Sequence, residues 1–185
     1  MSETETTAAT RRNSSLVIRG AEPADYEAIH GVVLGAYAQH AGQLAPEVFS
    51  RYLAAELDLG THASYGRLLV AATQEGVLGF AASYPDASVQ GSGFPSGWAS
   101  VRVLAVHPGA DGSGVARALL GACEHLAAEA AAPVLAIRTA SFMTDAIAGY
   151  EQLGYRRSPE FDGAEPARSV AQVRYVAQMY MTLRR

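Results

Sequence analysis

The chain has 185 residues, of which 49% are hydrophobic and 17% charged. This is an ordinary composition for one globular domain, and it excludes a chain that is disordered over most of its length. The formal net charge of -4 provides no basic surface for a nucleic acid, and no apolar stretch approaches the roughly 20 residues of a membrane-spanning helix. We therefore expect a cytoplasmic protein with neither a nucleic-acid nor a membrane partner.

Two residue types limit the chemistry. All 14 basic residues are arginine, which excludes mechanisms that need a Schiff-base or phosphate-loop lysine. Cys123 is the only cysteine, so an internal disulfide and a cysteine-cluster zinc site are also excluded. It lies in an alanine-rich helical segment, where a buried thiol is a better interpretation than a nucleophile. No two histidines stand at metal-ligand spacing with a carboxylate, so we expect no metal.

The first half of the chain predicts a tail, a strand, two helices and a hairpin. Residues 1–15 are rich in Ser, Thr and Glu without an apolar period, so we interpret them as a flexible tail and 16–185 as one domain. The predicted elements are a strand at Leu16–Arg19, a helix over Pro23–Gln39, a helix over Pro46–Leu59 that Gly60 ends, and strands at Arg67–Thr73 and Val77–Tyr84.

The second half begins with a connection rich in Pro, Gly and Ser, Pro85–Gly97, whose length leads us to expect it beside a functional site. The predicted elements after it are a strand at Ala99–Val106, a helix over Gly114–Ala130, a strand at Pro133–Thr139, a helix over Met143–Leu153 that Gly154 ends, a strand starting at Tyr155, and a strand at Val173–Leu183. Hairpins beside strand-helix-strand crossovers predict an α/β fold, with a mixed, mostly antiparallel sheet and helices on both faces.

In the last predicted strand, Val173–Leu183, the residues at every second position are apolar. Its apolar face consists of Val173, Tyr175, Ala177, Met179, Met181 and Leu183. Such a strand could form a sheet edge that pairs with a second copy, so a homodimer is one alternative and a covered edge is the other.

The segment Leu104–Leu120, LAVHPGADGSGVARALL, carries the strongest chemical signal, because it leaves a strand and opens a helix. Gly112 and Gly114 allow a tight backbone and close approach of a ligand. The unpaired N–H groups at the helix start, with the positive end of the helix dipole, form an anion site that a pyrophosphate fits. On the glycines alone, the alternative is a surface turn in which Asp111 or Ser113 caps the helix.

A dinucleotide-binding oxidoreductase fits this segment poorly. Its fingerprint requires a third small residue where Arg117 stands, and an acidic residue near the end of the next strand, where Arg138 stands.

A second segment, Gly149–Tyr155 (GYEQLGY), ends a helix and starts a strand about thirty residues downstream. Together with Leu104-Ala-Val-His-Pro and the Gly112 turn, it resembles the GNAT superfamily of N-acetyltransferases. Members of that family carry a Leu-Ala-Val-x-Pro strand, an Arg/Gln-x-x-Gly-x-Gly/Ala loop opening a helix, and later Tyr-Glu-x-Leu-Gly-Phe/Tyr. The element order from Leu16 to Leu183 matches the family's acyl-CoA N-acyltransferase fold as well.

The resemblance implies that acetyl-CoA binds as co-substrate where the strands ending at Val106 and beginning at Pro133 separate. Backbone groups of Leu104 and Val106 would pair with the pantetheine arm, and an N–H near Val106 would polarise the thioester carbonyl. Amides of the turn and helix start would hold the pyrophosphate. The implied cofactor-binding residues are Leu104, Ala105, Val106, Asp111, Gly112, Ser113, Gly114, Val115, Ala116 and Arg117.

The resemblance also gives Tyr150 the role of general acid toward the leaving CoA thiolate, which suits a phenol that stays protonated at neutral pH. From the residues alone, Tyr150 is better interpreted as an aromatic on the buried helix face with Ile147, and the motif reverses that preference. The implied reaction is direct attack by a primary amine, on a small molecule or a protein N-terminus, in a ternary complex. The alternative is a catalytically weak acyl-CoA-binding module of the same fold.

The chain departs from the family pattern at three places. Asp111 occupies the usual Arg/Gln position, where a carboxylate would repel a pyrophosphate. Phe142-Met143 stands where relatives often have Asn. Ser100 and Arg102 occupy the strand where many relatives have a Glu, which leaves the general base open among four candidates, Tyr84, Asp86, His62 and Glu160.

Acceptor specificity in this fold would come from three connections, the one around His40 and Pro46, Pro85–Gly97, and Phe161–Ser169. The last two predict an aromatic and acidic mouth for a cationic amine, formed by Phe94, Trp98 and Phe161 beside Asp162 and Glu165.

Overall fold

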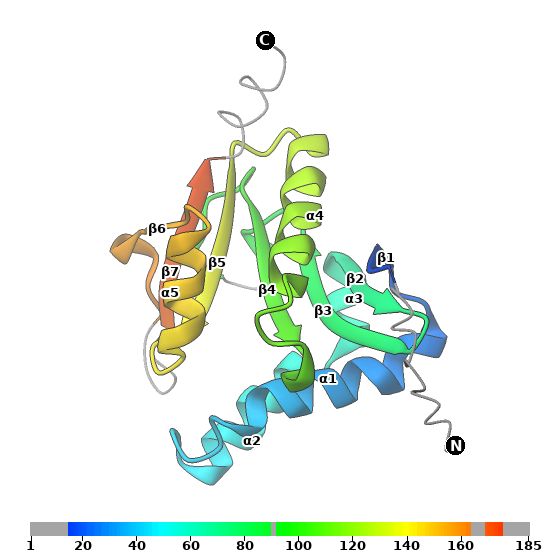
Figure 1. Cartoon of the computed structure of the whole chain (residues 1–185). Helices are drawn as coiled ribbons and strands as arrows, with labels where there is room; N and C mark the ends of the chain where they lie inside the picture. Colours follow the sequence, from blue (N-terminus) through cyan, green and yellow to red (C-terminus); the bar gives the residue numbers. More distant parts are fainter. Residues whose placement is uncertain (1–14, 90–91, 164–168, 176–185) are drawn as a thin grey trace, which may run out of the picture.

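A computed structural model describes residues 15–89, 92–163 and 169–175 (Figure 1). Within them, the strands are β1 (Val17–Gly20), β2 (Arg67–Thr73), β3 (Gly76–Tyr84), β4 (Ala99–Val106), β5 (Val134–Ala140), β6 (Arg156–Arg157) and β7 (Ser169–Tyr175). The helices are α1 (Tyr26–Ala38), α2 (Pro46–Glu56), α3 (Leu59–Tyr65), α4 (Val115–Glu129) and α5 (Thr144–Gln152). None of these helices is both long and apolar enough to cross a bilayer. The predicted tail lies, except for Ser15, outside the described residues.

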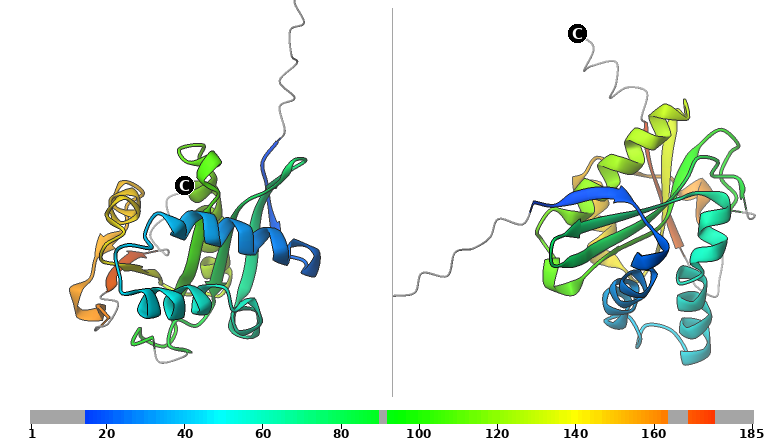
Figure 2. Two further views of the ribbon diagram at one scale, coloured as in Figure 1. Left: turned by 90° about the horizontal axis from the view of Figure 1, so that it is seen from below. Right: turned by 90° about the vertical axis from the view of Figure 1, so that its right-hand side faces the viewer.

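The strands form one mixed sheet in the order β1-β2-β3-β4-β5-β7-β6, in which β4 and β5 are parallel and the other described pairs antiparallel. Helices cover both faces (Figure 2). Leu69 of β2 packs in the cluster under α4, whereas its neighbour Leu68 packs under α1 on the opposite face. Both positions are apolar because successive side chains of a strand point to opposite faces, and here both faces are buried. The predicted fold class is confirmed.

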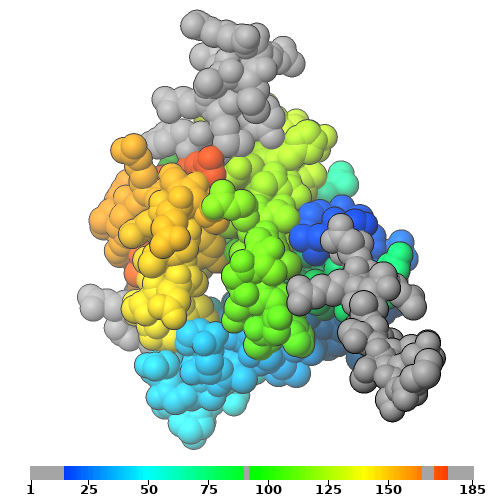
Figure 3. Space-filling view, in the orientation of Figure 1, coloured from blue at the N-terminus to red at the C-terminus, as the bar shows by residue number. Residues whose placement is uncertain are grey.

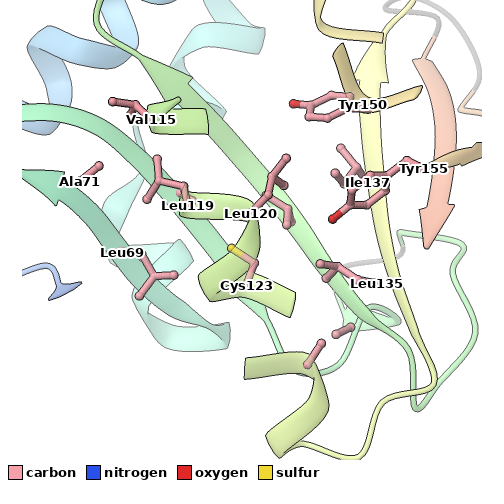
Figure 4. Packing of buried hydrophobic residues seen from close by; sticks show 14 of the residues in the cluster. Leu69, Ala71, Val115, Leu119, Leu120, Cys123, Leu135, Ile137, Tyr150 and Tyr155 are labelled. Carbon is pink, nitrogen blue, oxygen red and sulfur yellow. The ribbon is translucent and has the colours of Figure 1, made fainter. Parts of the chain in front are cut away.

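Helix α4 lies against the sheet through an apolar stripe that repeats at helical spacing. The stripe consists of Val115, Leu119, Leu120, Cys123 and Ala127, all of them buried (Figure 4). Cys123 has no exposed surface, and burial raises the pKa of its thiol to about 12. The interpretation of Cys123 as a core residue is therefore confirmed.

Close approach of α4 to the sheet depends on Gly79 in β3. A Cβ atom added there would lie 2.6 Å from Val115 Cγ1 and 3.0 Å from Leu119 Cδ1. Both distances are shorter than a normal van der Waals contact, so the start of α4 takes up its position because residue 79 has no side chain.

The prediction that Gly60 ends the second helix is wrong. Helix α2 ends at Glu56, and Gly60 is the second residue of α3. The break occurs because the Asp58 carboxylate accepts a hydrogen bond from Thr61 N at 3.0 Å and so caps a new helix. A capping side chain therefore decides this boundary rather than the glycine.

The last predicted strand starts earlier than expected, at Ser169 rather than Val173. The strand expected to start at Tyr155 consists of Arg156–Arg157. Over Gln172 and Val173, β7 lies between β5 and β6, so the edge predicted for pairing with a second copy is covered there. The rest of the predicted apolar face, from Ala177 to Leu183, lies outside the described residues.

Candidate active site

Strands β4 and β5 separate after a short parallel contact. They pair only over Ala99–Val101 and Leu135–Ile137. The ladder between β3 and β4 skips Arg102, because Ser83 pairs with Val101 and Ala82 with Val103. An extra residue of this kind is a β-bulge, which bends its strand and re-aims side chains. Beyond the bulge, the two strands diverge and leave a wedge between them.

Backbone groups of β4 face this wedge. His107 N donates to Leu78 O at 2.8 Å, which closes the antiparallel ladder with β3. Since hydrogen-bonded and non-hydrogen-bonded positions alternate along such a ladder, Leu104 and Val106 direct their N–H and C=O groups away from β3 and toward β5. There the parallel ladder has already ended, so these groups are available to an extended ligand.

A cavity of about 490 Å³ occupies the wedge. Figure 3 shows its outer part as a groove between α5 and the green surface of the Pro108–Gly114 turn and α4, with α1 and α2 below. Of the residues expected to bind a cofactor, those that line the cavity are Leu104, Ala105, Val106, Asp111, Gly112 and Ala116. Ser113, Gly114, Val115 and Arg117 do not line it, and the Val115 side chain lies in the core.

The turn before α4 presents backbone donors rather than side-chain caps. Gly112 and Gly114 both have positive φ, at 73° and 89°, and Gly114 caps the helix without a side-chain hydrogen bond. Ser113 donates its hydroxyl proton to Ala110 O instead, so the alternative in which Asp111 or Ser113 caps the helix is wrong. The hydrogen bond from Ala118 N to Gly114 O starts the helical series. The N–H groups just before Ala118 therefore have no acceptor within the helix and can bind an anion.

The His107 side chain stabilises the start of the connection between β4 and α4. Its Nδ1 accepts a hydrogen bond from Gly109 N at 3.0 Å, which fixes the 3-10 turn Pro108–Ala110. Pro108 in turn packs close to Gly35 of α1, where an added Cβ would lie 3.2 Å from Pro108 Cδ. The turn is thus held in place by packing and hydrogen bonding before any ligand arrives.

Tyr150 lies on α5 across the wedge from α4 and lines the cavity. Its side chain is 8% exposed and packs against Tyr155, with 6.0 Å between the ring centroids. In Figure 4, its hydroxyl end is turned toward the β4 and α4 side. Burial raises the pKa of this phenol, so it remains protonated and able to donate at neutral pH.

The four candidate bases are placed elsewhere. His62 Nδ1 lies 2.8 Å from the Tyr84 hydroxyl in a buried pair behind β3, Asp86 accepts from Ser88, and Glu160 is exposed. None of the four lines the cavity. No described group of three or more His, Cys, Asp or Glu side chains could hold a metal ion.

A different carboxylate lies beside the cavity. Glu56, at the end of α2, accepts a hydrogen bond from the Tyr37 hydroxyl at 3.3 Å, and Tyr37 and Tyr52 both line the cavity. Burial raises the pKa of Glu56 to about 7, while Tyr37 and Arg102 oppose that rise. The sequence analysis missed Glu56. Its spacing of four residues from Tyr52 places the two on one helix face, but only the fold shows which face meets the cavity.

The three connections expected to define acceptor specificity reach the cavity in different ways. His40 lines it directly beside Phe142, with 5.5 Å between the ring centroids. Neither the described part of Pro85–Gly97 nor Phe161–Gly163 lines it. Phe94, Trp98 and Phe161 do pack together, as the sequence suggests.

The predicted aromatic and acidic mouth is nevertheless wrong in its charge. Asp162 forms an ion pair with Arg157 and accepts from Ala171 N, so its charge is already matched. The guanidinium group of Arg138 instead lies over the Phe94 ring, 4.6 Å from the ring centroid. Glu165 lies outside the described residues.

Comparison with known proteins agrees with this geometry. The sequence model of the acetyltransferase (GNAT) domain matches residues 64–157, just over half of the chain. No curated protein sequence matches. Among solved structures, the chain resembles the PaiA N-acetyltransferase from Thermoplasma acidophilum in complex with coenzyme A, at 13% identity and a TM-score of 0.70, with 87% of this chain and 99% of that chain covered.

Two further solved structures share the fold. An acetyltransferase of the GNAT family from Staphylococcus aureus has 12% identity and a TM-score of 0.66, with 88% of this chain and 99% of that chain covered. YncA from Salmonella typhimurium, solved with its cofactor acetyl-CoA, has 20% identity and a TM-score of 0.59, with coverages of 87% and 94%. At these identities, the structures show a common fold.

The chain belongs to the GNAT family of acetyltransferases. The resemblance that the Leu104 and Gly149 segments indicated is therefore confirmed.

Proposed function

We propose that this protein transfers the acetyl group of acetyl-CoA to a primary amine by direct attack in a ternary complex. The observation that carries the proposal is the wedge, where backbone groups of β4 face a cavity that also receives Tyr150. An extended amide-containing arm would pair with Leu104 and Val106, as an added strand pairs with a free edge.

The turn and the start of α4 fit the phosphate end of the same ligand. Their unpaired N–H groups and the helix dipole favour an anion, and the positive φ values of Gly112 and Gly114 bring the backbone close to it. Arg117 supplies a cationic side chain in the first turn of the helix, outside the cavity lining.

Acetyl-CoA, when bound, supplies the activated thioester carbonyl. A β4 N–H group that faces the wedge stabilises the negative charge that develops on the carbonyl oxygen when the amine attacks. Tyr150 donates its hydroxyl proton to the departing sulfur, since its raised pKa keeps it protonated. No covalent acyl-enzyme is needed, which agrees with the burial of Cys123 in the core.

The amine proton requires an acceptor, and we assign this role to Glu56. Tyr37 lines the cavity and donates to Glu56, so a proton released by the amine can pass through the Tyr37 hydroxyl to the carboxylate. A carboxylate whose pKa is about 7 is matched to proton transfer at neutral pH.

One observation favours the second candidate, a binding module that holds an acyl-CoA without efficient turnover. Asp111 is exposed, lines the cavity and lies in the turn proposed to hold the pyrophosphate, where its charge opposes the ligand's.

Two measurements distinguish these functions. Acetyl-CoA should raise the melting temperature while NADPH should not, because a ligand at 100 times its dissociation constant stabilises a fold by about 2.7 kcal/mol. Release of free CoA in the presence of amines should then fall about 100-fold in Tyr150→Phe with acetyl-CoA affinity retained, since the phenol acts on the leaving group. Stabilisation without any amine-dependent release would support the binding module. The absence of stabilisation would contradict both functions.

A further inference from the structure

Two arginines line the cavity on the face of the sheet opposite α4. Arg102 stands at the β4 bulge, and Arg138 follows the last β5 residue that pairs with β4. Val134 and Ala136, which share a face of β5 with Arg138, pack with Phe94 rather than with α4. Arg102 lies over the Tyr84 ring, in the cluster that contains α1. Both guanidinium groups therefore lie where the wedge opens, away from the groove between α4 and α5.

The positive charges of these arginines are offset only at longer range than an ion pair, by Glu56 for Arg102 and by Asp162 for Arg138. Among the described residues, no carboxylate forms an ion pair with either guanidinium. Neither Arg138 Nε nor Oγ1 of the next residue, Thr139, has a hydrogen-bond partner within the part of the chain that the structure describes, although both atoms are buried. Burial lowers the pKa of Arg138, and the positive charge of Arg102 lowers it further, while Asp162 opposes the shift.

Arg138 is held in a fixed position. Its Nη2 donates to Phe161 O at 2.7 Å while its guanidinium lies over the Phe94 ring. Phe94 and Phe161 belong to the two connections that do not line the cavity, and they position the Arg138 side chain that does line it.

We propose that the acceptor amine also carries an anionic group, a carboxylate or a phosphate, which binds between Arg102 and Arg138. This inference rests on the proposed acetyltransferase function and assigns the acceptor class. Guanidinium groups are suited to these anions because their planar donors match two oxygens at once. Two like charges held together in a partly buried cavity also gain more from an anion than a single exposed arginine does.

The arrangement also separates the two ends of the acceptor. Tyr37 and Tyr52, backed by Glu56, provide the polar wall on the α1 and α2 side, where an ammonium group is favoured. The arginines provide the opposite charge from β4 and β5. An acceptor with an amine and an anion a few bonds apart could place its ammonium group near the tyrosines and its anion near the arginines. A polyamine would instead place a cation near the arginines.

The test uses matched amines that differ by the anionic group: phenylalanine against phenethylamine, glycine against methylamine, and phosphoethanolamine against ethanolamine. We expect kcat/KM, measured from released CoA, to favour the anionic member of at least one pair about tenfold or more, the factor expected from one charge-assisted hydrogen bond. The pair that shows the preference distinguishes a carboxylate from a phosphate.

Arg102→Gln separates recognition of the anion from the intrinsic reactivity of each amine. It should lower kcat/KM for the anionic member about tenfold more than for the other member, whose change reports the effect of Arg102 on the pKa of Glu56. The control variant Arg51→Gln, at an exposed arginine of α2 outside the cavity lining, should change neither.

An equal loss of kcat/KM for both members of a pair in Arg102→Gln would overturn the inference, and so would a preference for the amines without an anion. In either case, measurable acetyl transfer would still support the proposed function. If no amine of the panel is acetylated, thermal unfolding of the CoA-saturated protein decides. An anionic amine should then stabilise the wild-type chain more than Arg102→Gln, and equal shifts would overturn the inference.

Discussion

Glu56 is coupled to the cavity through the Tyr37 hydroxyl, which donates to its carboxylate at 3.3 Å. Because its pKa is about 7, the wild-type rate should rise as pH increases through about 7 and Glu56 loses its proton. We expect Glu56→Gln to remove this limb of the pH profile and to lower kcat about 100-fold. The measurement is kcat from pH 5 to 9, in about half-unit steps, with saturating acetyl-CoA and one fixed acceptor.

The stability of the same variant tests the burial of the carboxylate. A pKa raised above the ordinary 4.5 means that the folded state binds the proton more tightly, so this contribution to stability is present below about 4.5 and is lost as pH rises through about 7. Glu56→Gln should therefore raise the melting temperature at about pH 8 by about 2 to 4 °C, the shift produced by about 1 kcal/mol in a chain of this size. A variant that keeps the pH limb and loses stability would show that Glu56 is structural.

Asp111 gives a second test at the scale of one residue. If the turn before α4 holds a pyrophosphate, Asp111→Asn removes a like charge and should tighten CoA binding about two- to fivefold, as for an exposed charge pair. Titration calorimetry should show the gain shrinking as salt is added, because salt screens exposed charges. The control Glu75→Gln, in the turn between β2 and β3, should leave the dissociation constant unchanged. Weaker binding in Asp111→Asn would mean that the carboxylate positions the turn instead.

At the scale of elements, the contact between β3 and α4 sets the position of the proposed phosphate site. Gly79→Ala would place a Cβ atom 2.6 Å from Val115 Cγ1 and 3.2 Å from Ala105 O, so the start of α4 must move away. We expect a loss of about 1 to 3 kcal/mol in the free energy of unfolding, together with weaker CoA binding.

The matched control for this change lies in α4 itself. A Cβ atom at Gly121 meets no atom of the described residues within 4 Å, so Gly121→Ala should stabilise the helix by about 0.5 to 1 kcal/mol. Chemical denaturation of the two variants checks both signs. Equal stability of Gly79→Ala and the wild-type chain would show that α4 can shift without cost, and it would remove the close contact as the determinant of the turn.

Elements that follow from a local residue pattern could be predicted from the sequence. Boundaries and irregularities that depend on competing local signals or on pairing between strands could not. The β2–β3 hairpin follows from two apolar runs around a short turn, and α4 follows from its repeating stripe. The boundary at Gly60 failed because the Asp58 cap starts a helix before the glycine can end one. The bulge at Arg102 has no local signature, since it depends on how β3 pairs with β4.

The candidate site divides in the same way. The ligand-facing backbone of β4 and the turn before α4 belong to one continuous segment, so a motif could reveal them. Glu56, Arg102 and Arg138 come from α2, β4 and β5, and they meet only when the sheet is assembled and its strands diverge. Their charges could therefore not be assigned to one cavity from the sequence.

At the scale of the whole molecule, the sheet consists of two halves with a short junction. β1–β4 form one half and β5, β7 and β6 the other, and only the three residue pairs from Ala99–Leu135 to Val101–Ile137 join them. In Figure 1, α4 lies beside β3 and β4 of the first half, while α5 lies beside β5 and β7 of the second. A ligand that pairs with β4 inside the wedge would extend this junction, so binding should couple the two halves.

Amide hydrogen exchange tests this coupling directly. CoA should slow exchange at Leu104 and Val106, whose N–H groups face the wedge, and at the N–H groups that start α4, because each would gain an acceptor or lose access to water. Exchange in the β2–β3 hairpin, which pairs over its full length without the ligand, should change little and serves as the internal control. Protection confined to the start of α4 would mean that the phosphate end binds while the wedge stays open, which would contradict the extended binding mode on which direct transfer depends.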